Sequence, residues 1–394
     1  MTAVETPFVH FSTLMREIML PFWSTEGWAA DPEMFCERLD FSGHPMHEVP
    51  HRAMVQGRQI FVFTHAARLG VFPGGAEPAM RALHTLLRRF CDEGDPRNGV
   101  CFSVSPSGQT VSAVRDSYTH AFILFALASA YRLTGEAKLR QTIDRTVAFI
   151  DESLVDARHF GLHDRHPQPS GLKSQNPLMH LLEAYLALHE AIPDGPFLDR
   201  AAAIVAHFRA RLFQDEPGVL LEFYDSDWSL LQGQPEGRFF EPGHQFEWAW
   251  LLTWYGTLSG TDQGALSERL WRTACAHGVS GAGLCFDEVG IDLAPQKRSH
   301  RLWPHAEAIK AAIVRRDAGD ARAEEVAAAM AGVLDGHFLN RPFPAGWVDR
   351  IDADRQALVD FVPASSLYHL YSAFSELLRS GVDGAHVQQQ TAAS

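Results

Sequence analysis

Cysteine is scarce in this 394-residue chain, and the five that occur form no CxxC pair. An odd number of unpaired thiols favours a reduced compartment over a disulfide framework. The stretch MTAVETPFVHF at the N-terminus also lacks a basic region followed by a long apolar core. We therefore expect no signal peptide and a cytoplasmic protein.

Long hydrophobic runs and basic clusters are also missing. The longest apolar run, AFILFALASAY at residues 121–131, is shorter than the roughly 20 residues that span a bilayer. The net charge of −14 would repel polyanions, and no cluster of Lys and Arg offsets it. We expect a soluble protein with neither a membrane nor a nucleic acid as partner.

Two kinds of catalytic or metal motif are absent or weak. No GxSxG nucleophile elbow occurs, which argues against a Ser/His/Asp hydrolase. The stretch HPMHEVPH places His44, His47 and His51 close together, as metal ligands are often placed. Two prolines interrupt this spacing, and a chain with 20 histidines produces clusters by chance, so we expect no metal there.

The stretch EPGHQFEWAW, residues 241–250, is more informative. It places His244 and Glu247 three positions apart, on one face of a helix, and Pro242 with Gly243 is typical of a loop that leads into a helix start. Taken alone, such a pair is also typical of an ordinary helix start whose histidine bonds to a neighbour.

Five other segments share this plan, with polar or aromatic residues at the start of an apolar helix. They are RQIFVFTHAARLG, DSYTHAFILFALASAYRLTG, NPLMHLLEAYLAL, WPHAEAIKAAIV and SSLYHLYSAFSELL. Marker residues in the six segments, namely Arg58, Tyr118, Asn176, His244, Trp303 and His369, are separated by 60, 58, 68, 59 and 66 positions. The chain therefore repeats with a period of about sixty residues.

Amphipathic stretches with one charged face alternate with these apolar segments. They include FSTLMREIML near the N-terminus, EPAMRALHTLLRRFCDEG, KLRQTIDRTVAFIDESL, FLDRAAAIVAHFRARLF, ALSERLWRTACAHG and AEEVAAAMAGVLDGHF. Strand signals are limited to residues 100–114 and 219–224. The alternation predicts an inner and an outer layer of six helices each.

Closure of these helices into an (α/α)6 barrel is favoured over an open array, because the inner segments are apolar nearly all round. Length alone would favour two domains, but a closed barrel predicts a single catalytic domain over 1–394. We expect short flexible tails at about 1–8 and 383–394.

In such a barrel the starts of the inner helices meet at one end and form a candidate site. The ring contains Arg58, Tyr118, Asn176, His180, His244, Glu247, Trp303, Glu307 and His369. Asp116, just before the second inner helix, could belong to it or could only cap that helix.

Two histidines with an arginine and aromatic rings suit the movement of a proton next to a carbonyl group. Neutral imidazoles exchange protons near pH 7, and we expect the positive ends of helix dipoles to keep both histidines neutral. Arg58 could stabilise an enediolate oxyanion, and Trp303 and Trp347 offer flat faces to a sugar ring. A glycosidase using carboxylates among Asp116, Glu247 and Glu307 stays open, as does a sugar-binding protein without catalysis.

At these residues the chain resembles the N-acylglucosamine 2-epimerase superfamily, which includes mannose isomerases and cellobiose 2-epimerases. The resemblance runs from about residue 52 to residue 380 and rests on RAMVQGRQIFVF, DSYTHAFILFAL, NPLMHLLEAYLAL, EPGHQFEWAWLL, RLWPHAEAIKAA and PASSLYHLYSAF. It implies an (α/α)6 barrel and chemistry without a metal or other cofactor. It also implies that His244 and His369 are catalytic and that the substrate-binding residues include Arg58, Asn176, His180, Glu247, Trp303 and Trp347.

Within this superfamily, GHQFEWAW and PASSLYHL look most like the mannose isomerases. The sequence therefore predicts an isomerase that interconverts D-mannose and D-fructose, with Tyr118 and Glu307 also in its substrate-binding ring. A 2-epimerase on the same barrel is the alternative. It differs only in that a proton returns to the opposite face of C2, where an isomerase returns it to C1. We expect a monosaccharide as substrate and a monomer or homodimer.

Overall fold

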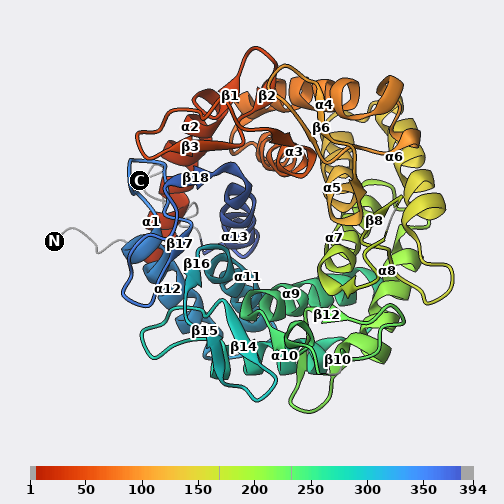
Figure 1. Ribbon diagram of the computed structural model, residues 1–394. Helices are drawn as coiled ribbons and strands as arrows, with labels where there is room; N and C mark the ends of the chain where they lie inside the picture. Colours follow the sequence, from red (N-terminus) through yellow and green to blue (C-terminus); the bar gives the residue numbers. More distant parts are fainter. Residues whose placement is uncertain (1–5, 168, 232, 383–394) are drawn as a thin grey trace.

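Six helices form an inner ring in the computed structural model, which describes residues 6–167, 169–231 and 233–382 (Figure 1). They are α3 (Ala53–Arg68), α5 (Ser117–Thr134), α7 (Gln175–Ala191), α9 (Pro242–Ser259), α11 (Trp303–Asp317) and α13 (Leu367–Arg379). Each packs against the next, and α13 packs against α3, so the ring closes. The (α/α)6 barrel predicted from the sequence is confirmed.

An outer layer of helices surrounds this ring (Figure 1). Its members that follow an inner helix are α4 (Ala76–Phe90), α6 (Ala137–Phe149), α8 (Phe197–His207), α10 (Gly264–His277) and α12 (Ala323–Val333). The sixth position is filled from the N-terminus by α1 (Pro7–Thr13), the π-helical turn η1 (Leu14–Met19) and α2 (Leu20–Thr25). Helix α1 contacts α12 and α13, so this N-terminal helix packs against the last two helices of the barrel.

The predicted tails are only partly covered by the structure. Pro7 and Phe8, which the sequence placed in a flexible tail, belong to α1, and the Phe8 side chain is buried. The Thr6 hydroxyl accepts a hydrogen bond of 3.3 Å from Val9 N and caps this helix. The rest of the predicted tails, residues 1–5 and 383–394, lies outside the described residues.

The two layers differ in burial as their composition predicts. In α5, every residue from Thr119 to Ala130 is buried, because the helix faces the outer layer on one side and the barrel interior on the other. In α4 the buried residues include Ala79, Ala82, Leu83 and Leu86, which lie along one stripe. Among the described helices, none is both long and apolar enough to cross a bilayer.

Each inner helix is preceded by a short strand, which pairs with an antiparallel strand after an outer helix. The six pairs are β4 (His51–Arg52) with β5 (Ser103–Val104), β7 (Arg115–Asp116) with β8 (Arg165–His166), β9 (Lys173–Ser174) with β12 (Phe223–Tyr224), β13 (Phe239–Phe240) with β14 (Glu288–Gly290), β16 (His300–Arg301) with β17 (Arg350–Ile351), and β18 (Phe361–Pro363) with β3 (Arg38–Asp40). These pairs link neighbouring repeats at the end of the barrel where the inner helices start.

Other short strands extend or accompany these pairs. They are β6 (Thr110–Ser112) on β5, β15 (Pro295–Lys297) on β14, β1 (Trp28–Ala29) with β2 (Met34–Phe35), and β10 (Phe213–Gln214) with β11 (Val219–Leu220). The sequence predicted strands only around residues 100–114 and 219–224. The others were missed because strands of two or three residues are too short to show an alternating pattern.

Four inner helices use a polar side chain in the first turn to hold the backbone of the segment before them. Gln56 and Gln245 each bond to both the N–H and the C=O of one residue, while His120 and His305 each accept an N–H on Nε2. The residues held are Phe35, Leu220, Val100 and Cys285, respectively. His120 and His305 thus hold the backbone of the preceding segments.

Candidate active site

Three aromatic side chains from three inner helices stand in a row where the helices begin. The ring centroids of His244 and Trp303 are 5.0 Å apart, and those of Trp303 and His369 are 5.3 Å apart. Trp303 therefore lies next to both imidazoles. Each imidazole ring is tilted by 39° or less against the indole.

The imidazole of His244 lies close to the carboxyl groups of Glu222 and Glu241. Its Nδ1 is 2.8 Å from Glu222 Oε2 and 3.8 Å from Glu241 Oε2. Burial opposes the charged imidazolium, but the attraction of Glu222 and Glu241 outweighs this and raises the pKa of His244 to about 9. At neutral pH His244 therefore carries a proton on both nitrogens and can act as an acid.

His369 has the opposite charge state. Its Nδ1 lies 2.7 Å from Glu307 Oε1, and its side chain is buried. Burial lowers the pKa of His369 to about 3, and the positive charges of Arg58 and Lys310 act in the same direction against the pull of Glu307. His369 is therefore neutral at pH 7. With Nδ1–H donated to Glu307, Nε2 is the nitrogen that can accept a proton.

The expectation that both histidines are neutral is therefore correct for His369 and wrong for His244. Helix dipoles act on both, but an ionised carboxylate at 2.8 Å outweighs a dipole. Glu222 lies on the segment before α9, and no feature of the local sequence links it to His244.

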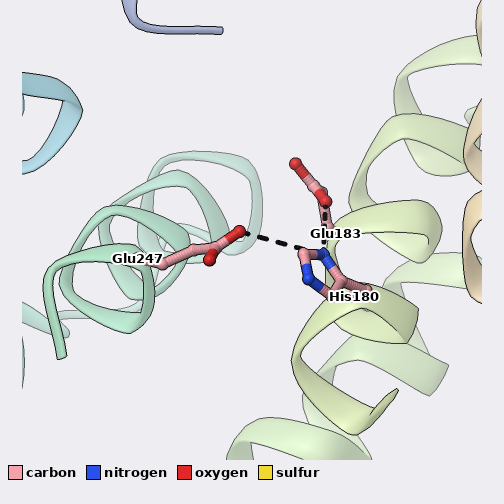
Figure 2. A group of neighbouring side chains, drawn as sticks. All are labelled: His180, Glu183 and Glu247. Carbon is pink, nitrogen blue, oxygen red and sulfur yellow. Dashed lines mark hydrogen bonds and ion pairs between the residues drawn. The ribbon is translucent and has the colours of Figure 1, made fainter. Parts of the chain in front are cut away.

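His180, Glu183 and Glu247 form a second cluster beside this row (Figure 2). His180 Nδ1 and Glu183 Oε2 share a hydrogen bond of 3.0 Å, and Glu247 Oε1 lies 3.8 Å from the same nitrogen. The Tyr368 hydroxyl donates to the other oxygen of Glu183. Burial, together with the charge of Arg58, holds the pKa of His180 well below its usual range.

Glu247 is buried, and neither of its oxygens has a hydrogen-bond partner. Burial raises its pKa well above the usual range, and the neighbouring Glu307 adds to this while Lys310 opposes it. This shift favours the protonated form of Glu247, which can donate one hydrogen bond and accept another. A buried, unpartnered group of this kind is suited to the hydroxyl of a ligand.

Arg58 is held rigidly beside these clusters. Its Nη2 donates to the Tyr118 hydroxyl at 2.6 Å and its Nη1 donates to the Ser365 carbonyl at 3.1 Å. The guanidinium carbon lies 4.3 Å from the ring centroid of Phe122 and 4.9 Å from that of Tyr368. Arg58 is therefore a fixed positive charge in an apolar surrounding, where it interacts strongly with a developing anion.

Asn176 and Asp116, two further residues considered from the sequence, lie at the starts of α7 and α5. The half-buried Asn176, in the first turn of α7, has a side-chain oxygen without a partner, which leaves it available to a ligand. Asp116 Oδ1 accepts from Thr119 N at 2.8 Å, so it caps α5 as the simpler interpretation predicted.

Trp347 lies elsewhere. Its side chain is fully buried and stacks on Trp23 at a centroid distance of 4.8 Å, so the indole offers no face to a ligand. This placement argues against the substrate contact predicted for it. The interlayer packing that buries Trp347 is not visible from the local sequence AGWVDRID.

The structure brings together possible metal ligands in two places. Ligand atoms lie within 4.8 Å of one another in the sets His180, Glu183, Glu247 and Glu247, Glu307, His369. Both sets share Glu247, whose raised pKa disfavours the ionised form that binds a metal. In the second set, Glu307 already faces the ammonium of Lys310 at 2.8 Å, so a cation there would meet an existing positive charge. The histidines of HPMHEVPH form no comparable set within the described residues.

A cavity of about 660 Å³ opens at the opposite end of the barrel, where the inner helices end. Its lining includes Arg68, Arg132, Trp254 and Arg379. It does not reach the paired histidines. Glu183 belongs to its lining, so the cavity reaches the cluster around His180 at this residue.

Several residues of the site were missed from the sequence. Glu183 and Lys310 follow His180 and Glu307 by three positions, which is the spacing that identified Glu247 after His244. The same pattern could therefore have found them. Glu241 precedes His244 by three positions and shares this spacing, whereas Glu222 and Tyr368 carry no signal that distinguishes them from ordinary loop or core residues.

The family of sugar epimerases described as N-acylglucosamine 2-epimerase (GlcNAc 2-epimerase) matches residues 35–373. The chain belongs to this family. A mannose-6-phosphate isomerase of Rhizobium meliloti (strain 1021) is 31% identical over 386 residues, which are 92% of this chain and 94% of that protein. A D-mannose isomerase of Thermobifida fusca is 29% identical over 323 residues, or 75% of this chain and 76% of that protein.

The fold is shared with solved structures of the same kind. The cellobiose 2-epimerase of Bacillus thermoamylovorans B4167 superimposes with a TM-score of 0.84 at 16% identity, over 93% of this chain and 98% of that one. Family membership makes the protein a sugar isomerase or epimerase. The glycosidase and the non-catalytic binder weighed from the sequence are thereby disfavoured.

Proposed function

We propose that this protein is an aldose–ketose isomerase that interconverts D-mannose and D-fructose. One observation carries the proposal: two imidazoles of opposite charge state lie next to the Trp303 indole. The neutral one is a base and the protonated one is an acid, and sugar isomerisation needs both. A relative named D-mannose isomerase supports this choice of sugar. The relative named mannose-6-phosphate isomerase shares the mannose skeleton, but its name specifies the phosphorylated sugar.

The reaction begins with opening of the sugar ring. His244, protonated at neutral pH, donates a proton to the ring oxygen and then accepts the proton of the anomeric hydroxyl, so it ends the step in its starting form. Nε2 of His369 then removes the proton from C2 of the open aldose, and a cis-enediolate forms. The same imidazole returns the proton to C1, while a hydroxyl proton moves from O2 to O1, and the product is the ketose.

Arg58 and His180 stabilise the enediolate. Arg58 supplies a fixed positive charge, and its aromatic surroundings keep water away from it. Asn176, Glu247, Tyr118 and Glu307 bind sugar hydroxyls or hold the groups that do, and Trp303 offers its indole to the sugar. Trp347 has no part in this proposal.

The substrate we propose is the free sugar and not a sugar phosphate. Arg301, whose guanidinium lies 5.2 Å from the Trp303 ring centroid, is paired with Glu241 and Asp287. The Arg301 guanidinium is therefore already paired with two carboxylates and is not a free partner for a phosphate dianion. Turnover of D-mannose, measured beside turnover of D-mannose 6-phosphate, tests this choice of substrate.

A 2-epimerase is the second candidate, and the same acid–base pair favours it. If His369 removes the C2 proton and His244 delivers one from the opposite side, the product is the C2 epimer of the substrate. The cellobiose 2-epimerases among the relatives keep this reaction in consideration.

An NMR spectrum of D-mannose incubated with the protein in D2O tests the proposal. Fructose as product, with deuterium entering at C1, supports the isomerase. Glucose as product, with deuterium at C2, would establish the epimerase. Unchanged mannose and no exchange would contradict both. A single catalytic domain over 1–394, a cytoplasmic location and a monomer or homodimer stay predictions.

A further inference from the structure

Lys310 is a lysine with no exposed surface in the interior of the barrel. Its Nζ lies 2.8 Å from Glu307 Oε2 and 3.8 Å from the ring centroid of Trp250. An ammonium group is strongly disfavoured in such a place unless a carboxylate compensates its charge. Lys310 and Glu307 therefore stabilise each other as ions.

Glu307 links this lysine to the proposed base. Its Oε2 faces Lys310 as an ion pair, and its Oε1 lies 2.7 Å from His369 Nδ1. Lys310 and Glu307 belong to α11, and His369 belongs to α13. The three groups form a series from the barrel interior to the row of aromatic rings.

The charge balance around Glu307 depends on Lys310. Other titratable or charged groups lie close to this series on the neighbouring inner helices. They are Glu247 on α9, Glu183 on α7, Tyr368 on α13 and Arg58 on α3. Burial opposes ionisation of all three carboxyls, yet Lys310 together with the bond from His369 lowers the pKa of Glu307 to about 2. Burial raises the pKa values of Glu183 and Glu247 instead. One buried cation thus keeps one carboxylate ionised.

We propose that Lys310 is the positioning residue that decides which nitrogen of His369 carries the proton. By keeping Glu307 ionised, it makes that carboxylate a pure acceptor, so His369 must donate from Nδ1 and keep Nε2 free. Without Lys310, Glu307 takes up a proton and donates it to Nδ1. The hydrogen of His369 then moves to Nε2, and that nitrogen can no longer accept a proton from C2.

Nitrogen-15 NMR of histidine-labelled protein tests this inference without substrate. Nδ1–H and Nε2–H tautomers give distinct nitrogen shifts, and a His369→Asn variant identifies the signals of His369. We expect the Nδ1–H tautomer in the wild type and the Nε2–H tautomer in Lys310→Met. Lys138→Met, on the exposed outer helix α6, is the control and is expected to leave the spectrum unchanged.

Activity provides a second measurement, which rests on the proposed function. Lys310→Met should lower kcat by at least about 10²-fold with little change in KM, because binding groups stay in place while the base is in the wrong tautomer. In a Glu307→Gln background the same substitution should add little, since Lys310 acts through Glu307. An effect equal in both backgrounds would overturn the inference.

The tautomer of His369, measured without any activity assay, is enough to test the role of Lys310. A wild-type protein with His369 in the Nε2–H form would overturn the inference even if no Lys310 variant folds. So would a folded Lys310→Met protein that keeps the Nδ1–H form. The product of the reaction does not enter this measurement, so glucose in place of fructose would refute the proposed isomerase and leave the role of Lys310 standing.

Discussion

His369 and Glu307 lie 2.7 Å apart on two different inner helices, and their bond leaves Nε2 of the imidazole as the free basic nitrogen. His244 meets Glu222 at a similar distance of 2.8 Å, yet it is charged while His369 is neutral. The difference arises from the other charges nearby. Glu241 adds a second acid beside His244, whereas Lys310 compensates Glu307, the acid bonded to His369.

The two histidines should respond differently to removal. His369→Ala is expected to abolish exchange of the mannose C2 hydrogen in D2O, because the base that removes this proton is gone. His244→Ala should slow mannose turnover severely but keep measurable exchange at C1 of fructose, which has a larger open-chain fraction. Exchange that survives in the His369 variant and vanishes in the His244 variant would reverse the assignment.

The pH profile should reflect the raised pKa of His244. Because His244 acts as an acid, kcat/KM should be level near neutrality and fall as the pH rises through about 9, where the imidazolium loses its proton. Glu222→Gln removes the nearest negative charge and should move this fall to lower pH by about 1 unit or more. Glu152→Gln, at an exposed ion pair of the outer layer, is the control. An unmoved upper limb in Glu222→Gln would show that another group controls it.

Arg58→Lys should not behave as a conservative change. A lysine cannot reproduce the planar guanidinium that donates to Tyr118 and Ser365 and packs on two aromatic rings. We expect kcat to fall by roughly 10²-fold or more if Arg58 stabilises the enediolate. Steady-state kinetics with D-mannose measure this, and a variant within about threefold of the wild type would assign Arg58 to structure alone.

Chelation should leave the activity intact. Two imidazoles of opposite charge state supply the proton transfers, and both possible ligand sets contain Glu247, whose raised pKa disfavours the ionised form that binds a metal. We expect protein dialysed against EDTA to keep full turnover of D-mannose. Loss of turnover that a divalent ion restores would establish a metal-dependent reaction.

Trp347→Phe and Trp303→Phe should separate stability from binding. Trp347 is fully buried against Trp23, so its replacement should lower the free energy of unfolding by about 1–3 kcal/mol and leave KM unchanged. Trp303 lies next to both histidines, so its replacement should reduce kcat/KM. Denaturant unfolding and steady-state kinetics measure the two effects. A raised KM in a stable Trp347 variant would return that residue to the site.

Much of the barrel could be predicted from the sequence because its signals are local. The repeat of about sixty residues and the change from helices apolar all round to helices with one charged face identify the two layers. The short strands before the inner helices escaped prediction, since two residues show no periodicity. Pro7 and Phe8 escaped as well, because their place in α1 depends on packing against distant helices.

The sequence by itself determined which residues lie at the starts of the inner helices, and so that His244, Trp303 and His369 would meet. Only the tertiary structure decided what each of them can do. Glu222 is 22 positions from His244 and Glu307 is 62 positions from His369, so neither partner is visible in a local pattern. Charge state depends on burial and on all charges within a few ångströms, and those distances exist only once the barrel closes.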